Sequence, residues 1–359
     1  MKKIKLGDLC VPSAGQLKKD SDELIDYIDI SSVDNETKKV TGYQTLLFEE
    51  APSRARKTVK KGSILVSTVR PNLNAVAMLE EDTPNISVAS TGFCVLDSKE
   101  NVDNRFILNF CKSKTFINAM VAQATGASYP AVSDKIVRAA LVPDYTYEEQ
   151  CNISEVLYKV SNVIEKRKAE LCSLDDLIKA RFVELFGDPI RNTQNRPTTE
   201  FINVVKMQRG FDLPVQDRQQ DGEIPVYGSN GALDYHNVAK IHGGVITGRS
   251  GTIGKVFYTE GDFWPLNTSL FSADTHGNNV IYLGYLLQLF DLTRFVEGTG
   301  VPTLNRNMFN NKQIIDIPID EQRVFADFVH QIDKSKSAVK KALDETQLLF
   351  DSLMQEYFG

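Results

Sequence analysis

The chain has few of the residues that build covalent cross-links, metal centres or membrane anchors. Its five cysteines are an odd number, and no two of them have C-x-x-C spacing. The four histidines, at positions 236, 242, 276 and 330, include no pair at metal-ligand spacing. The most apolar helix-like stretch, Tyr282–Phe290, is too short to cross a bilayer. These absences disfavour a disulfide-rich secreted protein, a metalloprotein and a membrane protein, and the free thiols fit a cytoplasmic location.

Motifs that carry out a chemical reaction are also missing. There is no G-x-S-x-G nucleophile motif and no glycine fingerprint for S-adenosylmethionine. GRSGTIGK, at Gly248–Lys255, resembles a phosphate-binding loop only in part. Arg249 stands where such a loop needs its first glycine, and Val256 stands where it needs Ser or Thr. We interpret this stretch as a glycine-rich turn between two strands, and we predict a protein that is not an enzyme and binds no metal or cofactor.

The composition is that of an ordinary globular protein with an acidic balance. The 359 residues are enough for two or three domains, and 42% of them are hydrophobic. The net charge of −6 argues against nucleic acid as a ligand, because phosphates attract Lys and Arg. That charge is an average over the chain, so a local basic face or a basic partner subunit would overcome it.

One segment of the chain is used twice. When the sequence is shifted by 172 positions, residues 149–187 fall on residues 321–359 without a gap, and eight of the 39 positions are identical. About two or three identities are expected by chance. The identical pairs are Glu149/Glu321, Gln150/Gln322, Lys168/Lys340, Leu171/Leu343, Leu177/Leu349, Glu184/Glu356, Phe186/Phe358 and Gly187/Gly359. The first copy ends at Gly187, where Asp188 and Pro189 form a strong helix stop.

Apolar residues recur every seven positions through both copies, which is the spacing of a coiled coil. Each copy predicts a helix of about 36 residues, or roughly 55 Å at 1.5 Å per residue. Three charges, Arg167, Arg181 and Lys336, also fall in the predicted seam. We predict that the two helices pack on each other rather than separately on their own domains. The residues predicted to line this spacer coiled coil are Leu157, Ile164, Leu171, Ile178, Leu185, Val329, Leu343, Phe350 and Tyr357.

The similarity between the two halves extends upstream of the helices. The matching stretches are 62–79 with 244–258, 89–97 with 266–274, 102–116 with 280–295 and 124–133 with 298–305. They are short β-branched runs separated by Gly, Pro and Asn, with one helix in each half, near 103–122 and 280–296. The predicted fold class is α+β, with two strand-rich globular domains, each followed by a long helix, and the two helices forming an antiparallel coiled coil with pseudo-twofold symmetry. In that arrangement Phe186 and Phe358 would each lie at the base of the other half's domain.

The order of these parts resembles the specificity subunit of type I restriction-modification systems. The phrases that carry the resemblance are ELFGDP after the first helix, GEIPVYGSNGALDYHN, GVITGRSGTIGKVFY and FWPLNTSLF in the second half, and KKGSILVSTVRPNLNAVA and GASYPAVSDKIVRAALVP in the first. The resemblance covers nearly the whole chain. It implies target-recognition domain 1 at residues 1–147, a first spacer helix at 148–187, a linker at 188–198, target-recognition domain 2 at 199–319 and a second spacer helix at 320–359.

The resemblance also implies a function and a set of partners. Each target-recognition domain would read one half of a bipartite, asymmetric target in double-stranded DNA. Two methyltransferase (M) subunits would dock on the helices and methylate adenine at N6, and two restriction/motor (R) subunits would join them. S-adenosylmethionine, ATP and Mg²⁺ would bind to these partners rather than to this chain. The M subunits would also supply part of the phosphate clamp that an acidic chain lacks.

Exposed loops with Arg, Lys, Asn, Ser or Thr are the places where base and phosphate contacts are expected. In the first domain such residues follow the strand at residues 63–69 and recur in the loop at 128–135, and the second domain has them at matching positions and in the YGSNG turn. The candidate DNA-binding residues are Arg70, Asn72, Asn74, Ser128, Tyr129, Ser133, Lys135, Tyr227, Ser229, Asn230, His236, Asn237, Arg249, Ser250, Thr252, Lys255, Thr303, Asn305, Arg306 and Asn307.

Three other interpretations remain open on the sequence. The acidic balance also fits a scaffold of two protein-binding modules on a coiled coil, without DNA. A DNA reader of the same architecture would equally serve a methylation-only or phage-defence system. A nucleotide-dependent enzyme built on Gly248–Lys255 is the third, and the departures from the phosphate-binding motif disfavour it.

Overall fold

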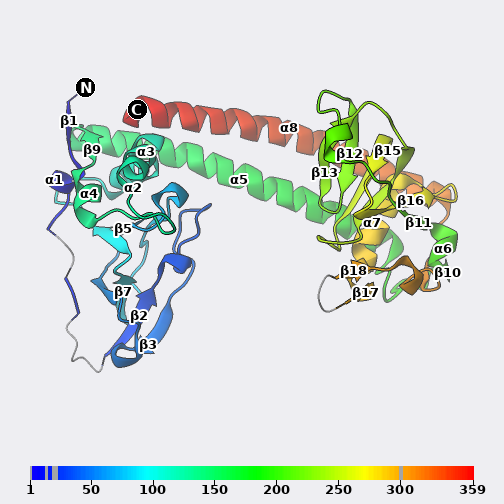
Figure 1. Cartoon of the computed structure of the whole chain (residues 1–359), viewed down its shortest axis with the longest axis horizontal. Coiled ribbons are helices and arrows are strands. Elements are labelled where there is room, and N and C mark those ends of the chain that lie inside the picture. Colours follow the sequence, from blue (N-terminus) through cyan, green and yellow to red (C-terminus); the bar gives the residue numbers. More distant parts are fainter. Residues whose placement is uncertain (1, 13–14, 18–22, 299–301) are drawn as a thin grey trace. The chain divides into compact units, whose positions relative to one another are not determined.

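The computed structural model describes residues 2–12, 15–17, 23–298 and 302–359 (Figure 1). The chain divides into two compact units, one made of residues 1–166 with 343–359 and the other of residues 167–342. Each unit holds one strand-rich domain and a portion of each long helix. These helices are α5 (Tyr147–Phe186) and α8 (Ile319–Phe358), both of 40 residues. Residues 299–301 of the matching stretch 298–305 lie outside the described residues.

The first unit is built around a four-stranded sheet with strand order β3-β2-β7-β4 and a three-stranded sheet with order β6-β5-β8. Neighbouring strands are antiparallel except β2 and β7. A further antiparallel pair joins β1, near the start of the chain, to β9, just before α5. The elements are β1 (Lys3–Lys5), α1 (Leu6–Leu9), β2 (Leu24–Ile28), β3 (Gln44–Leu47), β4 (Ala55–Thr58), β5 (Ile64–Ser67), β6 (Val76–Met78), β7 (Ile86–Ser90), β8 (Phe93–Leu96), α2 (Asn104–Lys112), α3 (Lys114–Gln123), α4 (Asp134–Ala139) and β9 (Leu141–Pro143).

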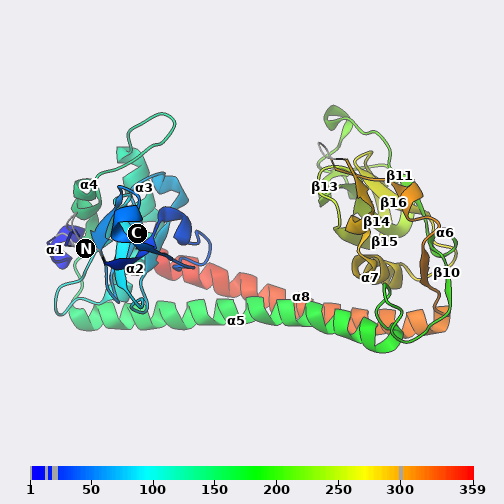
Figure 2. The same cartoon turned by 90° about the horizontal axis from the view of Figure 1, so that it is seen from below.

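The second unit is built around a six-stranded sheet with strand order β11-β16-β14-β15-β12-β13, in which only β12 and β15 run parallel. Helix α7 packs against β14 and β15, as Figures 1 and 2 show. The elements are β10 (Thr198–Glu200), α6 (Phe201–Val204), β11 (Lys206–Arg209), β12 (Ile224–Gly228), β13 (Gly231–His236), β14 (Ile241–Gly248), β15 (Val256–Pro265), β16 (Ser269–Asp274), α7 (Val280–Phe290), β17 (Val296–Glu297), β18 (Thr303–Leu304) and β19 (Gln313–Ile315). The predicted α+β class with mainly antiparallel strands is confirmed.

The helix predicted near residues 103–122 is two helices, α2 and α3, separated at Ser113. The Ser113 hydroxyl donates to the carbonyl of Phe110 at 2.7 Å and accepts the N–H of Phe116 at 3.2 Å. One serine therefore ends α2 and caps the start of α3, since serine satisfies the free N–H groups of a helix N-terminus. The prediction of a single continuous helix was wrong because a serine does not by itself signal a break.

The repeated glutamine makes the same contacts in both units. The Gln150 side chain accepts the N–H of Asp103, the residue that caps α2, and donates to the Tyr145 carbonyl. Its repeat partner Gln322 accepts the N–H of Asn279, which caps α7, at 2.8 Å. Both glutamines are buried. Each long helix is therefore held to a domain helix by a buried, hydrogen-bonded amide, which explains why both copies have glutamine.

The repeated phenylalanine packs into the domain core in each unit. Phe358, in α8, is fully buried, and its ring centre lies 5.3 Å from that of Phe106 and 6.0 Å from that of Phe110 in α2. Phe186, in α5, is also fully buried, and its ring centre lies 5.3 Å from that of Tyr282 in α7. The prediction that each phenylalanine packs on the domain of the other half is confirmed.

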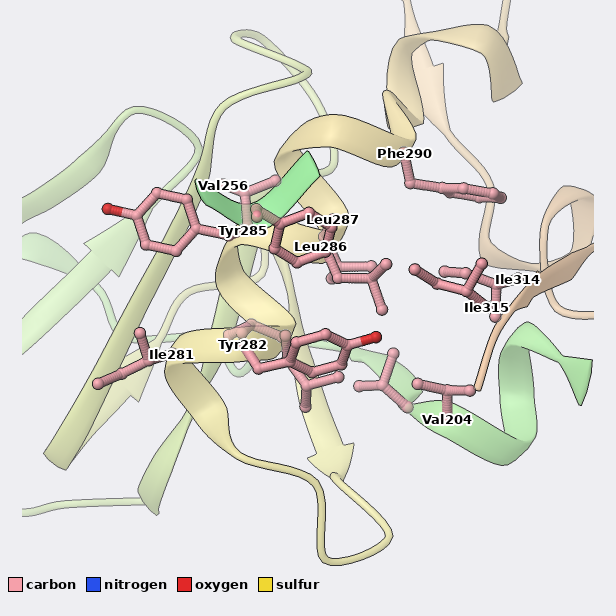
Figure 3. Close-up of a cluster of buried hydrophobic side chains, with 14 of the residues drawn as sticks. Val204, Val256, Ile281, Tyr282, Tyr285, Leu286, Leu287, Phe290, Ile314 and Ile315 are labelled. Carbon is pink, nitrogen blue, oxygen red and sulfur yellow. The ribbon is translucent and has the colours of Figure 1, made fainter. Parts of the chain in front are cut away.

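Helix α7 contributes many of the buried side chains in the hydrophobic core of the second unit. Figure 3 shows Tyr282, Leu286 and Phe290 of this helix in one cluster with Val204 of α6 and Ile314 of β19. These side chains are buried. The cluster also contains Phe182 and Phe186 from the end of α5 and Phe325 from the start of α8. The helix ends are therefore part of the core that positions the sheet.

Within each unit the α5 and α8 segments pack on each other in opposite directions. In the first unit Tyr145, just before α5, donates its hydroxyl to the Tyr357 carbonyl near the end of α8 at 3.3 Å. In the second unit Asp175 pairs with Lys336, while Phe182, further along α5, meets Phe325, which comes earlier in α8. The nine residues predicted to line the spacer are all buried or half-buried. The predicted packing of one helix on the other is therefore confirmed.

A half-buried ion pair compensates for one of the charges in the helix seam. The Lys336 ammonium lies 2.6 Å from Asp175 Oδ1 and 3.6 Å from Asp333 Oδ1. Burial alone would lower the pKa of Lys336, but the hydrogen bond and charge of Asp175 outweigh it, so that the pKa is raised. Arg167, a second charge in the seam, donates to the Ala342 carbonyl of α8. Arg181, the third, lies 2.8 Å from Glu184 of its own helix. The seam thus accepts these cations because an oxygen atom lies close to each one.

Candidate nucleic-acid interface

The stretch Gly248–Lys255 connects antiparallel strands β14 and β15, as the sequence predicted. Gly251 and Gly254 have φ values of +83° and +93°, and a Cβ on Gly248 would overlap the Thr252 carbonyl. Side chains other than hydrogen are strained or excluded at such positions. The glycines are therefore explained by the shape of the turn.

In the second unit the backbone joins this turn to the other candidate loop. The N–H of Leu304 donates to the Arg249 carbonyl at 2.8 Å, and Ser250 forms a β-bridge with Thr303. The N–H of Arg249 donates to the Thr268 carbonyl at 2.9 Å. The structure thus brings the candidates at 249–252 next to those at 303–307.

The first unit has the same arrangement in a different register. The N–H of Val132 donates to the Thr68 carbonyl at 2.9 Å, which corresponds to the bond between Leu304 and Arg249. Thr68 is therefore the structural counterpart of Arg249, although the sequence comparison placed Arg70 at the matching position. The two arginines differ by two positions in the fold, so they present their guanidinium groups differently.

Arg70 and Tyr129 form an exposed aromatic–cation pair. The Arg70 guanidinium carbon lies 4.7 Å from the centre of the Tyr129 ring, and 68% of Tyr129 is exposed. The N–H of Arg70 donates to the Pro130 carbonyl at 2.7 Å, which joins the two loops. Such a pair is worth about 0.5–1 kcal/mol at an exposed site and holds both planar groups in place. Planar cations and rings held in this way are suited to contacts with nucleic-acid bases.

Several candidate side chains already have structural roles. Ser133 caps α4, and Asn305 caps the 3₁₀ helix η6 (Arg306–Met308) by accepting the N–H of Asn307 at 3.1 Å. Asn74 is buried. Tyr227 is half-buried, and this burial raises its pKa.

Three further candidates make side-chain contacts within the second unit. The ring centre of His236 lies 5.2 Å from that of Trp264. Lys255 donates to the Asn230 side chain at 2.8 Å. The half-buried candidates are Tyr227, Ser229, His236, Arg249, Ser250, Thr252, Thr303 and Asn305. The exposed candidates are Arg70, Asn72, Ser128, Tyr129, Ser133, Lys135, Asn230, Asn237, Lys255, Arg306 and Asn307.

The sequence did not predict a groove in the second unit, beside β11. The groove has a volume of about 770 Å³, and its lining includes the candidates Arg306 and Asn307 together with Lys206, Gln208 and Arg209 of β11. The available signal was the stretch KMQR, in which polar residues flank a single methionine. That signal is weak, because the pairing of β11 with the distant strand β16 determines which side chains face outward.

The part of the chain that the structure describes contains neither a metal-binding cluster nor a membrane-spanning helix. Among these residues, no group of three or more His, Cys, Asp or Glu side chains lies close enough together to hold a metal ion. The helices described there also include none with the length and hydropathy needed to cross a membrane.

Comparison with known proteins identifies the family to which this architecture is similar. A family model described as the type I restriction modification DNA specificity domain matches residues 1–172 and 192–346, which together are most of the chain. The specificity subunit of the type I restriction enzyme HindI from Haemophilus influenzae is 27% identical over 150 residues. That match covers 40% of this chain and 32% of the relative's length.

Solved structures show the same fold over the whole chain. A chain from a study of complex assembly and conformational transition in the type I R-M system has a TM-score of 0.64 and 20% identity, and the match covers 99% of this chain and 97% of that one. The S subunit of the type I restriction-modification system from M. genitalium has a TM-score of 0.63 and 15% identity, with 100% and 96% covered. At these identities the two structures support the fold.

Proposed function

This chain belongs to the family of type I restriction-modification DNA specificity subunits, and on that premise we propose that it reads a bipartite, asymmetric target in double-stranded DNA. Specificity subunits are non-catalytic and carry no cofactor of their own, because S-adenosylmethionine and ATP belong to the M and R subunits. Each strand-rich domain would read one half of the target. The candidate residues in the exposed loops would make the contacts.

The observation that carries this proposal is a common framework with different exposed loops. Both domains join their two candidate loops through the same backbone hydrogen bond, made by Val132 in one and Leu304 in the other. On that framework the first domain exposes Arg70 and Tyr129, whereas the second exposes Lys255 and Arg306. An asymmetric target requires two recognition domains that share a framework but expose different residues to the DNA.

Deleting the gene is expected to remove N6-methyladenine from one bipartite motif with an unread gap in the host genome. Single-molecule sequencing of the deletion strain, the parent and a complemented strain measures this. The two half-sites should differ in sequence, because the two domains expose different side chains. A continuous palindromic motif would contradict reading by two domains. Absence of salt-sensitive DNA binding by the purified complex would contradict DNA reading altogether.

A repeated exposed leucine supports docking of two copies of one partner, which we take to be the M subunit. Leu177 and Leu349 are identical in the repeat, yet 46% and 51% of their surfaces are exposed. Glu184 and Glu356, also identical and exposed, lie seven residues further on, on the same helix face. Burial within the chain does not account for these pairs. Equal contacts with two identical subunits would account for them.

Leu177→Asp and Leu349→Asp are each expected to remove one M subunit from the complex, and the double variant to remove both. A carboxylate in an apolar contact is strongly disfavoured unless it is paired. Native mass spectrometry of the co-expressed complex measures the number of M subunits. Leu348→Asp is the matched control, because Leu348 is 70% exposed but its repeat counterpart is Asp176. Loss of M subunits in the control alone, or an unchanged count in the double variant, would contradict this docking site.

The same premise supports two R subunits in the complete assembly and a cytoplasmic location, where the DNA and the partners are found. The domain boundaries implied by the resemblance belong to this proposal as well. In a methylation-only system the R subunits would be missing, and the DNA-reading role of this chain would be unchanged.

A further inference from the structure

Strand β11 presents polar side chains at the edge of the six-stranded sheet. It is the first strand in the order β11-β16-β14-β15-β12-β13, so only one of its edges is paired. Met207 is buried and anchors the strand, while Lys206, Gln208 and Arg209 are exposed. An irregularity in the pairing with β16 between Lys206 and Met207 changes the direction of the strand at this point.

The 3₁₀ helix η6 forms the other wall of the groove beside β11. Arg306 Nη1 donates to the Met207 carbonyl at 3.3 Å, which ties η6 to the strand. Asn307 and Asn310 line the groove, and the Asn310 side-chain oxygen is buried without a hydrogen-bond partner among the described residues. Asp212 is a carboxylate in the lining, 3.9 Å from Arg209 and bonded to the Asn267 amide.

The charge of the groove is not a requirement of the fold. The N–H of Phe201 donates to the Lys312 carbonyl at 2.8 Å, and the N–H of Leu6 donates to the Ala140 carbonyl at the same distance. Because these two bonds are equivalent, Phe201 corresponds to Leu6 of the first unit. Lys206, five residues after Phe201, therefore corresponds to Val11. The framework therefore accepts an apolar residue where the second domain has lysine.

Resting on the proposed function, we propose that this groove binds duplex DNA at the second half-site. Lys206 and Arg209 contact phosphates, while Gln208 and Asn307 contact base edges. Three cations against one carboxylate give the lining a positive balance in a chain of net charge −6. Lysine and arginine are the usual phosphate contacts, and glutamine and asparagine can pair with adenine in the major groove.

Lys206→Ala and Arg209→Ala are expected to weaken binding about equally for all sequences. Each should also lower the slope of log affinity against log salt by about 1. Gln208→Ala and Asn307→Ala should instead relax the preference at a position of the second half-site, by about 5-fold to 100-fold. The measurement is a salt titration of the purified complex with M subunits, using duplexes that carry the native target or single base changes in either half.

Lys312→Ala is the matched control, because it removes an exposed cation outside the groove lining. An unchanged salt slope in Lys206→Ala and Arg209→Ala overturns the inference, as does an equal change in Lys312→Ala. Charged side chains also protect edge strands from aggregation. Variants that only aggregate, with unaltered affinity in the soluble fraction, overturn it too. If the wild-type complex itself does not bind DNA, the proposed function fails instead.

Discussion

A chain in which Phe358 is replaced by alanine is expected to lose about 3–5 kcal/mol of its free energy of unfolding. The side chain is fully buried and packs on Phe106 and Phe110 in the core of the first unit. Removing it leaves a cavity between α8 and α2 that the rings around it cannot fill. Chemical denaturation monitored by circular dichroism measures the loss. Phe186→Ala should have an equal effect on the second unit, because Phe186 packs in the same way on Tyr282.

Two controls separate this cavity effect from a general effect of substitution. Phe358→Leu keeps most of the volume and is expected to cost less than about 1.5 kcal/mol. Leu348→Ala, at a residue that is 70% exposed on the same helix, is expected to stay within about 0.5 kcal/mol of the wild type. A loss below about 1 kcal/mol for Phe358→Ala would show that this ring does not hold α8 on the domain. Under the proposed function, loosened packing should broaden the accepted gap before it changes the bases that are read.

Under the proposed function, removing one heptad from both long helices is expected to abolish methylation of the native motif. The deletion takes Ala169–Asp175 from α5 and the facing residues Lys334–Lys340 from α8, so that Asp175 and Lys336 are lost together and neither charge is left unpaired. Seven residues correspond to about 10 Å of helix, or roughly three base pairs. Methylation should move to the same half-sites with a shorter gap, or disappear if the new spacing cannot be bound.

The control for the deletion keeps the helix length and removes the ion pair. A double variant with Asp175→Leu and Lys336→Leu should keep the native gap, since this half-buried pair lies in an otherwise apolar seam and ion pairs in such places are often replaced by apolar residues without loss of stability. Sequencing of N6-methyladenine in strains that carry each variant reports both the half-sites and the gap. A native gap after the heptad deletion would refute the proposed role of the helices as the spacer.

Local periodic patterns predicted a large part of this fold. The seven-residue spacing of Leu157, Ile164 and Leu171 predicts the helix and its buried face, because both depend on neighbours along one helix. The turn at Gly248–Lys255 was predicted for a similar reason, since its glycines act on the backbone in place. The end of the first long helix at Phe186 was also predicted, because Gly187 and Pro189 are strong local stop signals.

Contacts between distant segments could not be predicted in this way. The repeat showed that Gln150 and Gln322 are identical, but only the fold shows that they bind the residues that cap α2 and α7. Thr68 was recognised as the counterpart of Arg249 only from equivalent hydrogen bonds between distant segments. The sequence comparison instead paired Arg249 with Arg70, two residues further along the chain. The exposed side chains of β11 depend on its pairing with β16, some 60 residues later in the chain. The sequence therefore predicted the framework better than the surface that contacts a ligand.

The closure of the first unit by residues 343–359 has a consequence for protein synthesis. Tyr145 and Tyr357 are hydrogen-bonded although 212 positions separate them. A ribosome completes the first domain early, but the aromatic pocket formed by Phe106 and Phe110 cannot be filled until the last turn of α8 emerges. Contacts of such long range form slowly, and a nascent chain with an open apolar pocket is prone to aggregation. Termination of synthesis between residues 343 and 357 would therefore damage the domain that is made first, while leaving the second unit complete.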